Sequence, residues 1–218
     1  ADNGAGAYDV MYPYMQARTI PGSYMPTTDY LAAPNVNQIT VSELQTMQAN
    51  GWTVVPHQTI GTALTGMSES QMRAEIEEVL AVHRSYGFTY ATMFYPAGGA
   101  GNALSDTVMA SYGIRYGNND NTANVQACRP LYGGMINPYK LWSYTSDGKT
   151  SAQIRTAVDH AIKYGGYLGL LWHDGTGADE TPFKDAVTYL YRLREANVID
   201  VVNYETFFNR FSSPRKAR

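Results

Sequence analysis

The chain has 218 residues and a mass of 24.0 kDa, which suits a single domain, 1–218, with its own core. Its net charge is -3, its pI is near 5.8, and its basic residues cluster only in the tail SSPRKAR, so we expect no nucleic-acid or anionic-membrane partner. The sequence contains neither a run of about eighteen apolar residues nor a signal-peptide pattern.

The chain is poor in charge and rich in tyrosine and glycine. Charged residues make up 16% of it, against about 25% in an average soluble domain. This composition suits an extracellular, cell-surface or virion location facing carbohydrate, and it equally suits a structural component of a larger assembly. The single cysteine, Cys128, excludes an internal disulfide and has no partner at zinc-site spacing.

Apolar, β-branched runs alternate with helix-period segments, which predicts an α/β fold. The segment ADNGAGAYDVMYPYM resembles the loop and helix that follow a strand, so we expect a first strand upstream, in a longer protein. A surface loop is expected at 117–126. The expected strands are 18–25, 52–59, 90–96, 113–117, 130–136, 167–173 and 199–203, and the expected helices are 8–16, 41–50, 68–86, 102–112, 151–164 and 181–196.

Helix-start signals are clearest in 68–86. Ser68 is the expected N-cap, Gln71 follows three residues later, and Gly87 ends the apolar period. His83 and His160 fall inside predicted helices, where a surface or packing role is the expected one.

Chemistry-bearing residues follow several predicted strands. In one barrel-like sheet, Asp2, His57, Pro96 and His173 would gather at the carboxyl-terminal face, where α/β barrels carry their sites. Taken singly, each signal is weak, because an Asp-Asn-Gly triplet is usually a turn and a lone histidine after an apolar run is usually an interior residue.

In order, these segments resemble the polysaccharide deacetylase family, the NodB-like carbohydrate esterases. The matching segments are DNGAGAYDVMYPYMQARTIPGSYMPTTDYL, SELQTMQANGWTVVPHQTIG, SESQMRAEIEEVLAVHRSYGF, MFYPAGGAGN, LGLLWHDG and VIDVVNYETFF. The resemblance covers essentially the whole chain. It implies a distorted (β/α) barrel of about seven strands.

The resemblance implies hydrolysis of an acetyl group on a polysaccharide or oligosaccharide, with a zinc-like divalent metal held by one aspartate and two histidines. Asp2 matches the general base, and His57 matches the first metal-binding histidine. His173 matches the histidine that acts as a general acid.

A sugar-binding groove is expected beside these residues. Pro96 and Ala97 match the segment whose backbone N–H holds the oxyanion, and Tyr95 and Trp172 each adjoin a motif residue. We therefore expect Tyr95, Pro96, Ala97 and Trp172 to contact substrate.

The departures from the family pattern fall mainly on the metal. Asn3 stands at the position of the metal-binding aspartate, and Gly61 stands at that of the second histidine. Phe94 replaces an arginine that orients the base in many members. Gln58, Thr59, Thr62 or Asp174 would supply a replacement ligand only if the loop bends differently from the family's.

Three interpretations follow. In the first, the chain is a metal-dependent carbohydrate deacetylase with an altered ligand set. In the second, it is an inactive deacetylase-like barrel, which either binds glycan or serves as a structural domain of a phage tail or cell-surface protein. The third is an α/β barrel hydrolase whose resemblance is only architectural. Acetylated glycan is the expected partner, together with other domains or subunits of a larger assembly.

Overall fold

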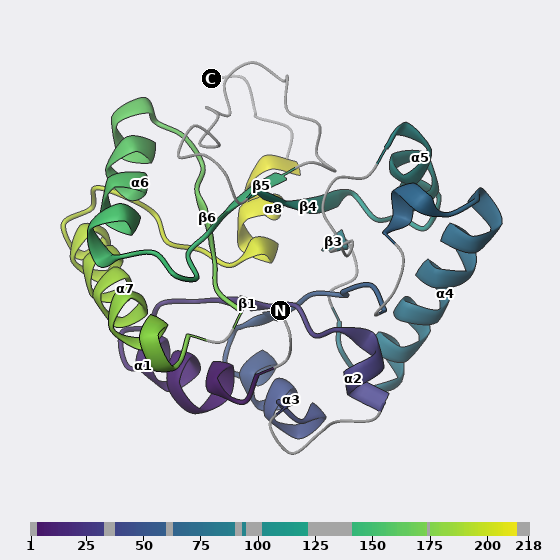
Figure 1. The fold of residues 1–218 in the computed structure, drawn as a ribbon, viewed down its shortest axis with the longest axis horizontal. Helices are drawn as coiled ribbons and strands as arrows, with labels where there is room; N and C mark the ends of the chain where they lie inside the picture. The colour runs from purple at the N-terminus through teal and green to yellow at the C-terminus, as the bar shows by residue number, and fades with distance from the viewer. Residues whose placement is uncertain are drawn as a thin grey trace.

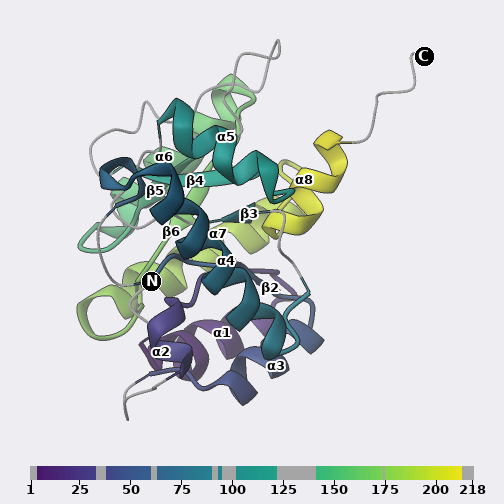
Figure 2. The same ribbon diagram turned by 90° about the vertical axis from the view of Figure 1, so that its right-hand side faces the viewer.

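A computed structural model describes residues 4–32, 38–59, 63–89, 93–94, 102–121, 141–173 and 175–212. The helices lie in a ring around centrally placed strands (Figure 1). Seen from the side, α1, α2 and α3 lie together at one end of the molecule (Figure 2). This arrangement is of the predicted α/β class.

The amino-terminal part alternates helices with two short strands. Its elements are a π-helix at Ala7–Met11, α1 at Tyr12–Gln16, β1 at Ser23–Tyr24, α2 at Thr28–Ala32, α3 at Val41–Ala49, β2 at Thr53–Val54 and a 3-10 turn at Leu64–Gly66. The remaining elements are α4 at Glu69–Ser85, β3 at Met93–Phe94, α5 at Ala103–Ser111, β4 at Tyr116–Asn121, β5 at Leu141–Thr145, α6 at Ser151–Tyr164, β6 at Gly169–Leu171, a 3-10 turn at Gly177–Asp179, α7 at Glu180–Glu195 and α8 at Tyr204–Ser212.

All strand pairs among the described residues are parallel. β1 pairs with β2, and a second sheet has the order β3-β4-β5-β6. The six strands described form two sheets, so the closure of the barrel and its expected count of about seven strands stay predictions. Parallel strands need crossover connections, and described helices provide these between β1 and β2, between β3 and β4, and between β5 and β6.

Helix boundaries follow the capping signals closely. The Ser68 hydroxyl accepts a hydrogen bond from the backbone N–H of Gln71, and the Gln71 side chain accepts one from the backbone N–H of Ser68. α4 therefore begins with a complete capping box. Thr150 and Gln153 start α6 in the same way, and α6 ends at Gly165, whose φ of 64° is left-handed.

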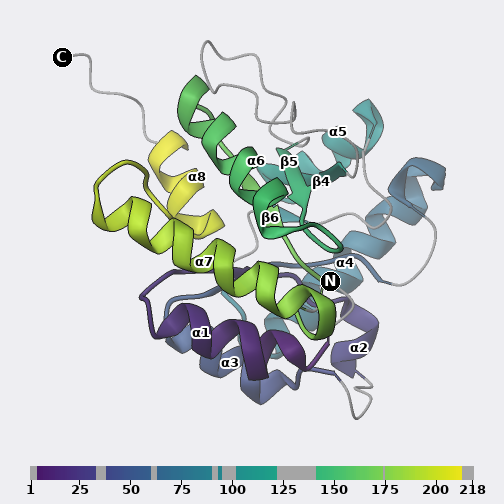
Figure 3. The same ribbon diagram turned by 60° about the vertical axis from the view of Figure 1, so that its left-hand side comes forward.

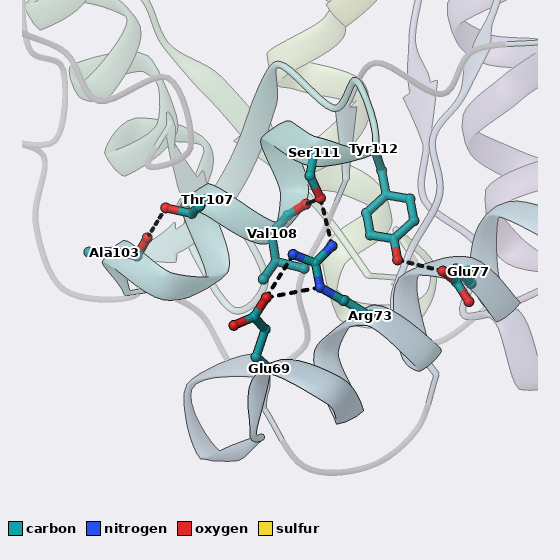
Figure 4. A network of polar contacts seen from close by, with 8 residues as sticks. All are labelled: Glu69, Arg73, Glu77, Ala103, Thr107, Val108, Ser111 and Tyr112. Carbon is teal, nitrogen blue, oxygen red and sulfur yellow. Dashed lines mark hydrogen bonds and ion pairs between the residues drawn. The ribbon is translucent and has the colours of Figure 1, made fainter.

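A polar network on the surface joins α4 to α5 (Figure 4). The Arg73 guanidinium donates to Glu69 Oε1 at 2.7 Å and to Ser111 Oγ at 3.0 Å. The Tyr112 hydroxyl donates to Glu77 Oε1 at 2.6 Å. Beneath it, the two helices share an apolar cluster formed by Leu64, Met72, Ile76, Val79, Leu80, Val108, Met109 and Ile114. Burial of this cluster supplies most of the energy that holds the helix pair together, and the exposed network adds little to it.

Several predicted strands are wrong in extent or type. The segment 199–203 pairs with no strand among the described residues. At its end, the Asn203 side chain accepts a hydrogen bond from the Thr206 N–H in the first turn of α8. Residues 117–121 of the predicted loop belong to β4. β5, α2 and α8 were not predicted, and the expected strand 130–136 lies outside the described residues. No helix in the described part of the chain is long and apolar enough to span a membrane.

Candidate functional site

His57 lies just beyond the carboxyl end of β2 and is 7% exposed. A parallel bridge to Thr27 extends the β1–β2 pairing to this residue, and the Thr28 hydroxyl donates to the His57 carbonyl oxygen at 2.7 Å. His57 Nδ1 lies 2.8 Å from the Gln58 carbonyl oxygen. A carbonyl only accepts, so Nδ1 carries the proton and Nε2 carries the lone pair of the neutral ring.

The segment after His57 is held by α4. Glu75 Oε1 accepts the backbone N–H of Thr59 at 2.8 Å and the Thr59 hydroxyl at 2.6 Å. One carboxylate oxygen thus accepts from both hydrogen-bond donors of Thr59, two residues beyond the histidine. The sequence reasoning missed Glu75, which occupies an ordinary acidic position in an amphipathic helix.

His173 lies two residues past the end of β6 and contacts Asp147, two residues past the end of β5. Its Nδ1 is 2.5 Å from Asp147 Oδ2, and its backbone N–H donates to Asp147 Oδ1 at 3.0 Å. The two contacts fix both the ring and the backbone of His173. A carboxylate in this position also selects the tautomer with the proton on Nδ1.

Hydrogen bonding controls the charge of Asp147. Burial raises the pKa of its carboxyl, but the hydrogen bonds from His173 outweigh burial and bring the pKa below the ordinary value of 3.8. Asp147 is therefore a carboxylate at neutral pH and stabilises a positive charge on His173. Sequence reasoning missed Asp147 because it missed β5; the signal was the turn SDG directly after the aromatic run LWSYT.

Trp172 lies between Leu171 and His173, and its ring packs against other side chains. It meets Phe183 of α7 edge-on, with ring centroids 5.3 Å apart. Its indole N–H is buried and has no hydrogen-bond partner among the described residues. These contacts give Trp172 a packing role that supports the end of β6, and its contact with substrate stays a prediction.

The other predicted site residues lie outside the described residues: Asp2, Asn3, Gly61, Tyr95, Pro96 and Ala97. Their roles therefore stay predictions. Of the predicted site, the structure describes His57, Trp172 and His173, each just beyond the end of a strand.

The described residues do not by themselves complete the metal site that the sequence led us to expect. They include no group of three His, Cys, Asp or Glu side chains placed to hold an ion. His57 has the tautomer of a metal ligand, with Nε2 carrying the lone pair, yet one imidazole falls short of the three protein ligands usual for catalytic zinc. We derive no chemical step through a metal.

Solved carbohydrate esterases and deacetylases have a similar fold. A protein from Mycobacterium smegmatis assigned as a polysaccharide deacetylase matches with a TM-score of 0.67 and 12% identity, over 98% of this chain and 82% of that one. A family 4 acetyl xylan esterase from Clostridium thermocellum, in complex with a cobalt ion, matches with a TM-score of 0.63 and 16% identity, over 93% of this chain and 83% of that one.

A third structure, a mutant of a CE4 family pseudoenzyme with restored enzymatic activity, matches with a TM-score of 0.60 and 9% identity, over 94% of this chain and 64% of that one. No protein-family model and no curated protein matches the chain. At these identities the likeness shows the fold alone, and it confirms the expected NodB-like polysaccharide deacetylase fold, whose barrel is of the (β/α) type.

Proposed function

We propose that this chain is a polysaccharide deacetylase-like hydrolase that removes acetyl groups from a glycan. The observation that carries the proposal is the contact between His173 and Asp147 at the ends of β6 and β5. A partly buried carboxylate that fixes both the ring and the backbone of one histidine prepares that histidine for proton transfer. The fold and the order of the sequence motifs support the same conclusion.

The proton transfers divide between two residues in this proposal. Asp2 takes a proton from the attacking water, whose oxygen adds to the acetyl carbonyl carbon. His173, as an imidazolium held by Asp147, gives its Nε2 proton to the leaving nitrogen or oxygen of the sugar as the bond to the carbonyl carbon breaks. The products are acetate and the deacetylated sugar.

The test is acetate release from acetylated chitooligosaccharide and acetylated xylan by the purified chain. His173→Gln and Asp147→Asn should each lower the rate by about 10²-fold or more, the size of a general-acid contribution. His160→Gln is the matched control, because His160 lies on α6 next to Tyr164 and should not alter the rate. Acetate release that does not change in His173→Gln would refute the proposed role.

A specific observation favours a second candidate, an inactive barrel that binds glycan. Among the described residues, His57 is a possible metal ligand, but no group of three ligands surrounds an ion site. The sequence has Asn3 and Gly61 at the positions of the other two expected ligands. In this candidate the wild-type chain binds acetylated oligosaccharide and releases no acetate.

The double variant Asn3→Asp, Gly61→His separates the two candidates. An inactive barrel should gain bound zinc or cobalt, measured by metal analysis, and should begin to release acetate. An active wild-type chain that loses its activity in His173→Gln would exclude the inactive barrel.

A further inference from the structure

The turn that carries Asp147 is held in place by Asp179. The Gly148 N–H donates to Asp179 Oδ1 at 2.8 Å, one residue beyond the carboxylate that contacts His173. Asp179 ends the 3-10 turn Gly177–Asp179, through which the chain passes from β6 into α7. His173 and Asp179, near the two ends of this connection, therefore bind neighbouring residues of one turn.

Different contacts fix the start and the tip of this turn. The Ser146 N–H donates to the Leu171 carbonyl oxygen at 2.8 Å, which continues the pairing of β5 with β6. The Lys149 N–H donates to the Ser146 carbonyl oxygen at 3.1 Å and closes the turn. Gly148 has a left-handed φ of 67°, which glycine adopts without steric cost. Its N–H bonds outside the turn, so Asp179 is the contact that holds the backbone of the tip.

Asp179 makes this contact instead of capping its own helix. An aspartate at the N-cap usually accepts a hydrogen bond from an N–H in the first turn of the helix. Asp179 occupies the N-cap of α7 and has no such bond. Ser68 and Thr150, by contrast, cap α4 and α6 with their side chains. A residue type that usually stabilises its own helix end is used here to hold a turn of another element.

The segment before Asp179 is packed tightly enough to be a fixed support. Gly175 is buried, and a Cβ atom on it would lie 2.7 Å from Met11 Sδ in the π-helix. The Asp179 N–H donates to the Thr176 carbonyl oxygen at 3.0 Å and closes the 3-10 turn. The backbone that carries Asp179 is therefore held by the contact with the π-helix and by its own turn.

A second carboxylate of α7 provides a comparison. Asp185 Oδ2 accepts a hydrogen bond from the Ser151 hydroxyl at 2.7 Å, at the start of α6. α6 and α7 lie side by side (Figure 3) and share a buried apolar cluster. These contacts hold the two helices together without Asp179. The bond from Gly148 to Asp179 therefore adds little to helix packing, and its specific effect falls on the turn.

We infer that Asp179 is a positioning residue of the His173–Asp147 pair. By holding the Gly148 N–H, it keeps the Asp147 carboxylate where both of its oxygens contact His173. Asp179 acts through the backbone of the turn. The catalytic consequence of this inference rests on the proposed function, whereas its geometric consequence does not.

Amide hydrogen exchange of the full chain tests the geometric consequence. Asp179→Ala should speed exchange at Gly148 by about tenfold or more and at His173 by about fivefold or more. Asp179→Asn keeps a weaker oxygen acceptor and should recover most of the protection at both amides. Asp185→Ala is the matched control and should change neither rate, because it removes only the tie to Ser151. Unchanged exchange at His173 in Asp179→Ala, or equal acceleration in Asp185→Ala, would overturn the inference.

Steady-state kinetics on acetylated chitooligosaccharide test the catalytic consequence. Asp179→Ala should lower kcat by about tenfold and change KM by less than about twofold, because a displaced carboxylate impairs proton transfer and leaves the contacts to the sugar intact. Asp185→Ala should change neither constant. A wild-type kcat in Asp179→Ala would overturn the inference. If the wild-type chain releases no acetate, the proposed function fails, and exchange at His173 alone decides whether Asp179 positions the pair.

Discussion

The buried histidine of α4 predicts a specific loss of stability in acid. His83 is 2% exposed, and both of its ring nitrogens are buried without a hydrogen-bond partner among the described residues. Its ring packs on that of Phe88, with the ring centroids 4.9 Å apart. Burial lowers the pKa of His83 from 6.5 to about 4, because the charged ring would lose its hydration without gaining a partner. The histidine is thus a packing residue, as its helical position indicated.

The sign and size of the effect follow from proton binding. Between pH 6.5 and about 4 the unfolded chain binds a proton at His83 and the folded chain does not, so the free energy of unfolding falls as the pH falls. A difference of about 2.5 pKa units corresponds to about 3 kcal/mol, reached below pH 4 and absent above pH 7. His83→Leu should remove this loss and should be neutral or stabilising at pH 7.5.

Urea unfolding followed by circular dichroism, at intervals from pH 7.5 to 4.0, measures the effect. The free energy of unfolding of His83→Leu, relative to wild type, should rise by about 3 kcal/mol across this range. His160→Leu is the control, because it replaces a partly exposed histidine on α6 and leaves His83 in place. If the His83→Leu and wild-type stabilities fall in parallel from pH 6.5 to 4, the burial argument is wrong.

Three further predictions concern the elements that hold the site. Ser68→Ala should destabilise the fold by about 1 kcal/mol in urea unfolding, because it removes the cap of α4, whereas Ser70→Ala should change little. Glu75→Gln should speed amide exchange at Thr59, because a charged acceptor becomes a neutral one; unchanged exchange would contradict its anchoring role. Asp147→Asn should destabilise the chain above pH 3.8, because the pKa of Asp147 is lowered in the folded state. The difference in the free energy of unfolding between this variant and wild type should shrink as the pH falls below 3.8. A difference that does not change with pH would contradict this prediction.

The helices were predictable from the sequence because their signals are local. The Ser68–Gln71 box starts α4 as expected, and α6 runs over Ser151–Tyr164, the full predicted range. Capping requires residues within one turn of each other, so a sequence window contains all the information. α2 is a single turn without such a box, and it was missed.

The strands were less predictable because pairing between distant segments selects them. The run LWSYT forms β5 because Ser143 and Tyr144 have partners in both β4 and β6. The segment IDVVN at 199–203 is rich in β-branched residues, yet it pairs with no strand among the described residues. The site residues were predictable to the extent that the strands before them were. His57 and His173 were found because they follow strands that were predicted, and Asp147 was missed because it follows one that was not.

The contacts of His173 allow a sharper test of its chemistry than loss of activity alone. A sugar amine is a poor leaving group that needs a proton from the His173–Asp147 pair, whereas nitrophenolate leaves without one. His173→Gln should therefore lower acetate release from acetylated chitooligosaccharide by about 10²-fold or more and from p-nitrophenyl acetate by less than about threefold. Asp147→Asn should show the same selectivity, because it acts through the histidine. Equal losses on both substrates would mean that these variants disturb the site as a whole, and the assignment of His173 as the proton donor would fall.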